Sequence, residues 1–485
     1  MKKYLLGIDV GTTGTKTILF SDSGELICHA YRGYPLSNKR VGESEQDPLD
    51  WWRAIVETVR EVTEGRGVSE SVLAISLSTQ GGTLVAVDKS GEPTRPAIVW
   101  NDIRFTEERE KYLSEIGEAD TLYRKCGWKL GRGLPLLAIR YLKDKEPETF
   151  EKSKKFLSTP SYVSLKMTGR AAVDISNAGI EQLVDIRSRS YDKELLSFAG
   201  VDESRLADLV LSGEVIGNLT AEAAMELGLS EKTVLVAGAH DQYAVSLGAG
   251  SVKAGDILIG SGTCWVVTAS GNEFDFDSGF AQSVSAVSNL FGTLRSLSSG
   301  GVCLEWLRAI ATGDDYEKIN REVESVRAAE DGLFFYPFKG IYGEGTFTKG
   351  AFVGMDLSHN RYHLARAVME GVVFQILWMM EEFKTKPSPD GLKLSGGASK
   401  SGVWSQILAD ASGLPIRIPE VADLASVGAA ILAGLGAGLY ATCEEGYEKF
   451  KIKEKLILPR KEMTEIYKPL IEKYKNQAAA LGKSY

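Results

Sequence analysis

The chain has 485 residues, of which 44% are apolar and 25% charged, a balance typical of a folded globular protein of about two to three domains. Lys and Arg number 56 and Asp and Glu 65, so the formal net charge is −9. This acidity excludes a dedicated nucleic-acid-binding protein, because phosphate neutralisation needs a basic face. The cysteines number five and form no CxxC pair, so we expect no disulfide or metal framework and place the protein in the cytoplasm.

The first predicted elements are two short strands joined by a Gly/Thr turn. The turn Gly11-Thr12-Thr13-Gly14 separates the apolar runs Tyr4–Val10 and Thr17–Phe20. A helix follows, because Asp47 suits an N-cap and Pro48 suits a first helical position. The next elements expected in this half are a strand at Val72–Ser78 and a helix at Leu136–Lys143.

The strand–turn–strand pattern returns in the second half of the chain. Val234–Gly238 is a buried strand that Tyr243–Leu247 continues, and Asp256–Val267 holds two strands around a Gly/Thr turn. We interpret the two hairpins as an internal structural duplication and divide the chain into domains 1–245 and 246–485. Later elements expected are a helix at Tyr362–Phe383, a strand–turn–helix from Leu392 to Ala411, and a Gly/Ala-rich core helix within Val427–Ala441. That last run has 15 residues, fewer than the ~20 a membrane span needs, so we expect no membrane insertion.

The first hairpin carries groups suited to a metal and phosphate site. Asp9, at the end of a buried strand, can hold Mg²⁺ through water. Gly11-Thr12-Thr13 offer backbone N–H groups and hydroxyls to phosphate oxygens, and Lys16 adds a positive charge. An ordinary Gly-rich hairpin is the alternative. The second turn, at Gly262-Thr263, disfavours it, because two such turns can grip one polyphosphate from both sides.

Two more segments complete the candidate site. Small residues at Gly396-Gly397-Ala398 let a flat ring approach the backbone, as an adenine pocket requires, although close packing uses the same pattern. Asp241, in the run Gly238-Ala-His240-Asp241-Gln242, is placed to accept the proton of a substrate hydroxyl during phosphoryl transfer. A solvated loop aspartate is the other interpretation. His240 is expected to pack or to hydrogen-bond beside this base rather than to catalyse.

These motifs follow one another in an order that matches a known family. Landmarks are Asp9-x-Gly-Thr-Thr, Trp100-Asn-Asp102-Ile-Arg104, Asp174-Ile-Ser-Asn177, Gly238-x-x-Asp241-Gln242, Gly262-Thr263, His363–Gly371 and Ser395-Gly-Gly-Ala398. Over essentially the whole chain they resemble the FGGY carbohydrate kinases, within the actin-like ATPase superfamily.

The resemblance implies an α/β fold of two ribonuclease-H-like domains, with mixed sheets flanked by helices, around a central cleft. It implies ATP and Mg²⁺ as cofactors, bound mostly by the second domain, and a small sugar or polyol, bound mostly by the first. It gives Asp241 the general-base position and Asp9 the metal position. Gly262-Thr263 take a phosphate position, and Gly396-Gly397-Ala398 fall in the adenosine stretch.

The substrate expected first is a ketopentose. The segment Pro96–Arg104 is most similar to xylulokinases, which predicts ATP-dependent phosphorylation of a primary hydroxyl of a sugar such as D-xylulose. A polar edge that orients a polyol is expected from Gln80, Trp100, Asp102 and Gln242, with the Trp100 ring also able to stack on a sugar face.

Two departures from the family pattern bear on that choice. Gly81-Gly82 stand where members carry large polar side chains, and Thr159-Pro-Ser-Tyr162 where a Pro-Lys-Asp-Tyr run is usual. The space and the exposed backbone N–H groups at Gly81 and Gly82 would suit gluconate or another sugar acid, a larger ketose, glycerol or another polyol.

Two other function classes stay open. One is a non-catalytic actin-like ATPase, which would lack the stretch Trp100–Arg104. The other is a sugar-binding regulator, against which the intact Asp9, Lys16 and Asp241 speak. The partner expected is a small sugar or polyol, with no nucleic acid and no membrane, and a homodimer is one option for the assembly.

Overall fold

The computed structural model describes residues 2–130, 133–329, 332–338, 340–342, 345–347, 349–388, 390–421 and 423–482. The chain forms two compact units, each built from separate stretches. The first comprises Met1–Val252, Asn272–Gly292 and Ala422–Ile452, and the second Lys253–Gly271, Thr293–Val421 and Lys453–Tyr485. The domains expected from the sequence, 1–245 and 246–485, are a different division, because the chain returns to the first unit twice after residue 252.

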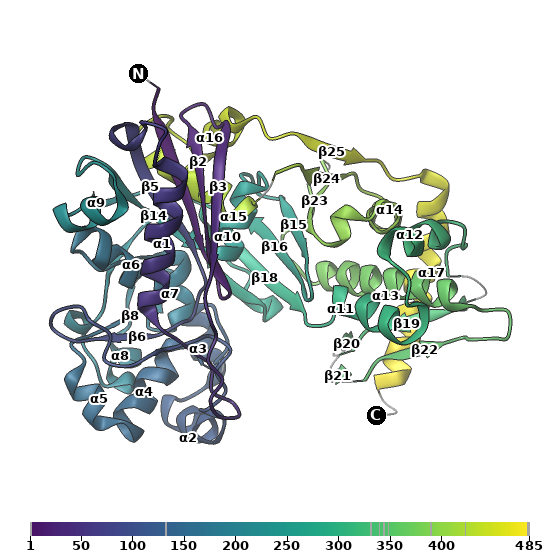
Figure 1. Ribbon diagram of the computed structural model, residues 1–485. Coiled ribbons are helices and arrows are strands. Elements are labelled where there is room, and N and C mark those ends of the chain that lie inside the picture. The colour runs from purple at the N-terminus through teal and green to yellow at the C-terminus, as the bar shows by residue number, and fades with distance from the viewer. Residues whose placement is uncertain are drawn as a thin grey trace. The chain divides into compact units, whose positions relative to one another are not determined.

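The first unit is built on a mixed β-sheet (Figure 1). In spatial order its strands are β13 (Val215–Asn218), β14 (Val234–His240), β5 (Val72–Thr79), β1 (Tyr4–Val10), β2 (Gly14–Ser21) and β3 (Leu26–Gly33). β1 and β2 form the antiparallel hairpin that the sequence predicts, with Asp9 opposite Lys16. β5 runs parallel to β1, and β14 parallel to β5. The carboxyl ends of β1, β5 and β14 therefore meet at one edge of this sheet.

Two helices cover opposite faces of this sheet. α1 (Pro48–Thr63) begins as predicted, with Asp47 as its N-cap, and its Thr58 hydroxyl lies 2.7 Å from that of Thr17 on β2. α15 (Leu424–Gly436) packs so closely on β1 that a Cβ at Gly7 would lie 2.0 Å from the Ser426 carbonyl oxygen. Gly7 pairs with Ile18, the residue next to Thr17 on β2. Because successive residues of a strand point to opposite faces, α1 and α15 contact opposite faces of the sheet.

α15 is the Gly/Ala-rich core helix expected within Val427–Ala441. Its buried residues run from Ala425 to Gly434, and it ends at Gly436 because the chain turns at Ala437. Small side chains let the backbone approach the sheet, and Asp423 is the N-cap of the helix.

Smaller elements complete the first unit. Its other helices are α2 (Thr106–Ile116), α3 (Ala119–Cys126), α4 (Pro135–Lys145), α5 (Pro147–Lys152), α6 (Thr159–Thr168), α7 (Ile175–Glu181), α8 (Lys193–Ala199), α9 (Ala221–Leu227), α10 (Asp241–Gly248) and α16 (Cys443–Phe450). Its short strands are β4 (Glu45–Gln46), β6 (Val85–Val87), β7 (Ala97–Ile98), β8 (Lys155–Leu157), β9 (Ala172–Asp174), β10 (Val184–Asp185), β11 (Ser190–Tyr191), β12 (Asp208–Val210) and β17 (Ala281–Val284).

The core of the first unit has two parts. One lies between the sheet and α1, around the fully buried Trp51 and Tyr162. The other lies under α4, around Leu137, Ile139 and Phe105. The helix predicted at Leu136–Lys143 is α4, which starts one residue earlier at a proline.

The second unit repeats the strand arrangement of the first. In spatial order its sheet includes β18 (Phe291–Leu297), β16 (Trp265–Gly271), β15 (Ile257–Ser261), β23 (Leu392–Gly396), β24 (Ile416–Pro419) and β25 (Glu454–Ile457). β15 pairs antiparallel with β16 and parallel with β23, as β1 does with β2 and β5. The predicted structural duplication is confirmed.

Helices flank this second sheet (Figure 1). They are α11 (Gly301–Leu307), α12 (Tyr316–Glu324), α13 (Arg361–Glu381), α14 (Gly402–Ser412) and α17 (Lys461–Gly482), with the short strands β19 (Phe334–Tyr336), β20 (Gly340–Tyr342), β21 (Gly345–Phe347) and β22 (Ala351–Val353). α13 and α14 are the helices expected at 362–383 and 404–411. The expectation of mixed sheets flanked by helices in both halves is thus confirmed. No helix in the described part of the chain is both long and apolar enough to cross a membrane.

Candidate active site

Asp9 and Lys16 lie at the turn end of the first hairpin. The Ser78 hydroxyl, at the end of β5, donates a hydrogen bond of 2.7 Å to Asp9 Oδ1. Lys16 Nζ lies 2.6 Å from Oδ2 of Asp423, the N-cap of α15. The sequence analysis missed Asp423, which is 407 residues from Lys16 along the chain. Its only local signal is its place before a Gly/Ala-rich helix.

Three carboxylates act on one another at this strand edge. Burial, together with the negative charges of Asp423 and Asp241, raises the pKa of Asp9 to about 7. The Ser78 hydrogen bond and the charge of Lys16 oppose that rise. A surplus of negative charge around a strand-end carboxylate fits a divalent cation. Among the described residues no group of three or more Asp, Glu, His or Cys side chains could hold a metal ion.

The turn after Asp9 is held from outside by side chains. The Thr12 carbonyl accepts a bond of 2.6 Å from Gln46 Nε2, and the Thr12 hydroxyl donates to Gln80 Oε1 at 3.1 Å. Gln46 Oε1 accepts from Gln80 Nε2 at 3.0 Å, which closes a small network. Gly11 and Thr13 lie on the accessible side of the same turn. The network fixes the turn, and the segment Gly11–Thr13 stays partly exposed.

Trp100 and Asp102 have different surroundings, although only Asn101 separates them. Trp100 is 47% exposed, and its indole N–H donates to the Thr12 hydroxyl at 3.1 Å, so a ring face is open beside the turn. Asp102 is fully buried and accepts bonds from the Ser44 N–H at 2.7 Å and from Arg104. Its carboxylate therefore holds the loop instead of facing a ligand.

Gln80 and the two glycines that follow are enclosed by other groups. Gln80 is buried, with its amide used by the network around Thr12. The prediction of open space at Gly81 is wrong, because a Cβ there would lie 2.3 Å from Cδ2 of His240. At Gly82 φ is +71°, and a Cβ would lie 2.7 Å from a methyl group of Leu134. Side chains from elsewhere fill the volume that the missing ones leave.

Asp241 begins α10 directly after β14, so it is a helix residue and not part of a loop. Its side chain is 34% exposed, and Gln242 beside it is also partly exposed. The strand before it carries a bulge between Val236 and Ala239. A Cβ at Gly238 would lie 1.6 Å from the Leu77 carbonyl oxygen, so only glycine allows this bulge. The bulge aims the strand end at the sheet edge that holds Asp9.

The second unit brings its two predicted nucleotide segments together. Ser261, the last residue of β15, accepts a bond of 2.6 Å at its carbonyl from the Gly397 N–H, and its hydroxyl accepts from the Ala398 N–H at 3.0 Å. Gly396, at φ +87°, makes the close turn past Ser261. Gly262-Thr263 follow directly and are exposed. Ser261 thus joins both segments, and sequence reasoning did not single it out.

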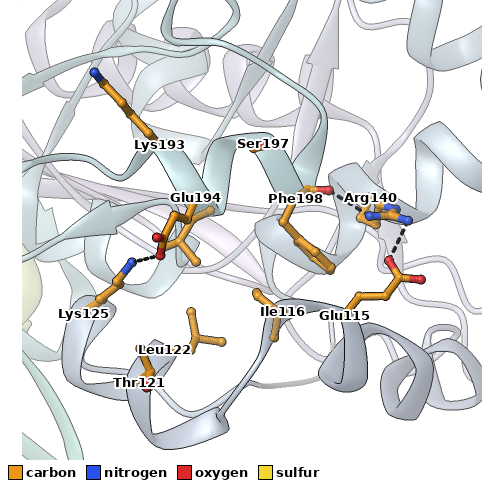
Figure 2. A pocket seen from close by; sticks show the side chains of 11 residues that line it. Glu115, Ile116, Thr121, Leu122, Lys125, Arg140, Lys193, Glu194, Ser197 and Phe198 are labelled. Atoms are coloured by element: carbon orange, nitrogen blue, oxygen red, sulfur yellow. Dashed lines mark hydrogen bonds and ion pairs between the residues drawn. The ribbon is translucent and has the colours of Figure 1, made fainter.

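A cavity of about 660 Å³ opens elsewhere in the first unit, among α2, α3, α4 and α8 (Figure 2). Its lining contains none of the predicted site residues. Lys125 is paired with Glu194 at 2.5 Å and Arg140 with Glu115 at 2.8 Å, so these cations are already neutralised. Figure 2 shows Ile116, Leu122 and Phe198 between these pairs. We therefore place the candidate active site at the strand edge that holds Asp9 and Asp241.

Comparison with known proteins identifies the family. The model of the FGGY family of carbohydrate kinases, N-terminal domain, matches residues 4–248, and that of the C-terminal domain matches residues 256–437. The chain is 30% identical to a xylulose kinase of Bacillus subtilis (strain 168) over 484 residues, covering 98% of this chain and 96% of the relative. It is 27% identical to a gluconokinase of the same strain, covering 91% and 88%.

Solved structures agree with this result. The crystal structure of a xyloylose kinase from Brucella ovis superposes with a TM-score of 0.89 at 26% identity and covers 99% of both chains. Matches to both family domains and to relatives along the whole chain lead to one conclusion. The chain belongs to the FGGY family of carbohydrate kinases.

Proposed function

We propose that this carbohydrate kinase transfers the γ-phosphoryl group of ATP to a primary hydroxyl of a ketopentose, with Asp241 as the general base. The observation that carries the proposal is the shared edge of the first sheet. Asp9 is the residue before the last of β1, Gln80 follows β5 and Asp241 follows β14, and these three strands are parallel neighbours. The proposed base and the proposed metal ligand thus lie at the same strand edge.

Asp241 is suited to the role of base by its exposure. A partly exposed carboxylate whose charge acts on Asp9 can reach an acceptor hydroxyl at this strand edge and take its proton as the phosphoryl bond forms. Gln242, one residue on, is placed to hydrogen-bond the same acceptor. The buried Asp102 keeps a positioning role through Arg104, which revises its expected place on the polar edge.

Asp9 fits a bound Mg²⁺, which would neutralise charge on the ATP phosphates. We propose that Lys16 binds the ATP phosphates as well, even though it contacts Asp423. An ammonium group has three N–H donors, so one bond to Asp423 leaves two for phosphate oxygens. In the second unit, Gly262-Thr263 and Gly396-Gly397-Ala398 are proposed to bind the nucleotide, because Ser261 holds the two segments next to each other.

A ketopentose is favoured over a sugar acid by the filled volume at Gly81. The xylulose kinase of Bacillus subtilis is a similar relative over the full chain, and His240 removes the free space that had favoured a larger acceptor. Gluconate stays the second candidate, since a gluconokinase is 27% identical to the chain.

A coupled ADP-release assay with Mg²⁺ and ATP tests the proposal over D-xylulose, L-xylulose, D-ribulose, D-gluconate and glycerol. D-xylulose should give the highest kcat/KM, and Asp241→Asn should lower kcat by about 10²–10⁴ with the Kd for ATP within about threefold. Asp277→Asn, at an exposed aspartate, is the matched control. A kcat/KM for D-gluconate a hundredfold above that for D-xylulose would reject the ketopentose, and full activity of Asp241→Asn would reject the base.

A further inference from the structure

The imidazole of His240 fills the space in front of Gly81. A Cβ added to Gly81 would lie 2.3 Å from Cδ2 and 2.6 Å from Nε2 of His240. Real Cβ atoms do not approach other atoms this closely, so any larger residue at position 81 must push the ring away. His240 is only 5% exposed. The ring has its present place only because residue 81 is glycine.

One ring nitrogen of His240 faces the proposed base. Nε2 lies 3.3 Å from Oδ1 of Asp241, whereas Nδ1 is buried and has no hydrogen-bond partner among the described residues. A neutral imidazole carries one N–H, and the nitrogen that faces a carboxylate oxygen is the one that can use it. Nε2 is therefore the ring nitrogen that can direct an N–H toward Asp241.

The backbone of His240 is held as firmly as its ring. Its N–H donates a bond of 2.9 Å to the Ser176 hydroxyl, which in turn donates to Asp174. Asp174 also accepts from the backbone N–H of Asn177 at 3.1 Å and from its Nδ2 at 2.7 Å. This chain of bonds ties the end of β14 to the start of α7. The bulge at Gly238 sets the direction of the same strand end.

The ring is also enclosed by other side chains. Trp128 lies edge-on at 6.1 Å between ring centroids, and Tyr243 lies at 5.7 Å. A Cβ at Gly81 would also lie 3.2 Å from a methyl group of Ile180. Packing of this kind leaves the imidazole a single orientation, with Nε2 toward Asp241.

We propose that His240 is the positioning residue of the base Asp241, and that Gly81 is the residue that makes this possible. The proposal rests on the proposed role of Asp241. The Nε2–H group holds Oδ1 of the carboxylate in one orientation, which leaves Oδ2 for the proton of the acceptor hydroxyl. A carboxylate free to rotate would spend less time in line with that hydroxyl, and small misplacements of a reacting group cost up to about a hundredfold in rate.

A stability cycle tests the Gly81–His240 contact without any substrate. Gly81→Ala should lower the Tm, whereas the same change in a His240→Ala background should have little effect, because the ring it displaces is gone. Gly217→Ala is the matched control, since its Cβ would meet only ordinary contacts at 3.5 Å. If the changes in Tm caused by Gly81→Ala and His240→Ala are additive, the proposed contact between the two residues is refuted.

Kinetics with D-xylulose and with D-gluconate as acceptor probes separate positioning from packing. His240→Leu keeps the volume but lacks a donor, and His240→Gln keeps an N–H donor near the position of Nε2. We expect His240→Leu to lower kcat about 10- to 100-fold, with the KM values for the two acceptors within about threefold of those of the wild-type chain. His240→Gln should keep kcat within about fivefold of the wild-type value. Gly81→Ala should match His240→Leu. His29→Gln, at an exposed histidine, is the control.

The results distinguish this inference from the proposed function. If Asp241→Asn is inactive while His240→Leu and His240→Gln both keep full kcat, the base stands and His240 serves only packing. If neither probe is phosphorylated by the wild-type chain, ¹⁵N NMR with labelled histidine decides the inference, because the chain has only four histidines. Protonation of His240 at Nε2 supports the contact to Asp241, and an unprotonated Nε2 overturns it.

Discussion

Replacing Asp9 by asparagine should stabilise the unliganded protein at pH 8. The pKa of Asp9 is about 7 in the folded chain against 3.8 for a free side chain, because burial and the charges of Asp423 and Asp241 disfavour its ionised form. The folded state therefore binds a proton more tightly than the unfolded state. The stability from that proton is complete below about pH 4 and is lost as the pH rises through about 7.

The size of the effect follows from the shift. About three pKa units correspond to ~4 kcal/mol of stability lost by pH 8. Asp9 keeps some solvent exposure as a residue, which screens the interaction, so we expect a gain of about 2–4 kcal/mol for Asp9→Asn. Asparagine keeps an oxygen for the Ser78 hydroxyl, so the hydrogen bond at this position survives.

Urea unfolding in EDTA at pH 5, 6, 7 and 8, followed by fluorescence, measures the difference between the wild-type chain and Asp9→Asn. The difference in the free energy of unfolding between the two proteins should be small at pH 5 and should increase through pH 7. Glu25→Gln, at an exposed turn, is the control and should change the free energy of unfolding by less than about 0.5 kcal/mol. Addition of Mg²⁺ should narrow the gap at pH 8 by stabilising only the wild-type chain. Equal stability of the two proteins at pH 8, or a gap that shrinks with pH, would refute the reasoning.

Three further outcomes are expected. Gly238→Ala should lower the free energy of unfolding by about 3 kcal/mol or more in urea, because its Cβ would overlap a backbone carbonyl, whereas Gly217→Ala should cost under about 1 kcal/mol. Trp100→Ala should raise the KM for the sugar about tenfold and leave that for ATP unchanged, and equal rises in both would contradict a stacking role. Arg104→Ala should lower the free energy of unfolding by about 3–5 kcal/mol in the same assay, because it leaves Asp102 as a buried carboxylate without its cation. A loss of activity at unchanged stability would instead indicate that Asp102 contacts the sugar.

Local signals made the hairpins and helix starts predictable. The turn at Gly11–Gly14 lies between two apolar runs, and Asp47 with Pro48 is a strong helix start, so β1, β2 and α1 follow from neighbours in the sequence. The repeated hairpin in the second half was predictable for the same reason. Helix ends were less accurate, because tertiary contacts decide where a frayed turn stops, as at α15.

Contacts between distant segments could not be predicted. Lys16 meets Asp423 only because α15 returns to the first sheet from far along the chain. Asp102 is of a residue type expected to bind a sugar, yet its carboxylate already accepts hydrogen bonds from Arg104 and from the Ser44 N–H. A single sequence states which groups are present, whereas the fold decides which of them are already paired.

The glycines at the candidate site serve different purposes, and their chemistry separates them. At Gly7 and Gly238 the obstacle to a side chain is a backbone carbonyl, so these positions are fixed by the fold whatever the substrate. At Gly81 the obstacle is the ring of His240, which is itself a side chain that can be replaced. A larger residue at 81 is therefore compatible with the fold only if residue 240 becomes smaller. The two positions must therefore change together.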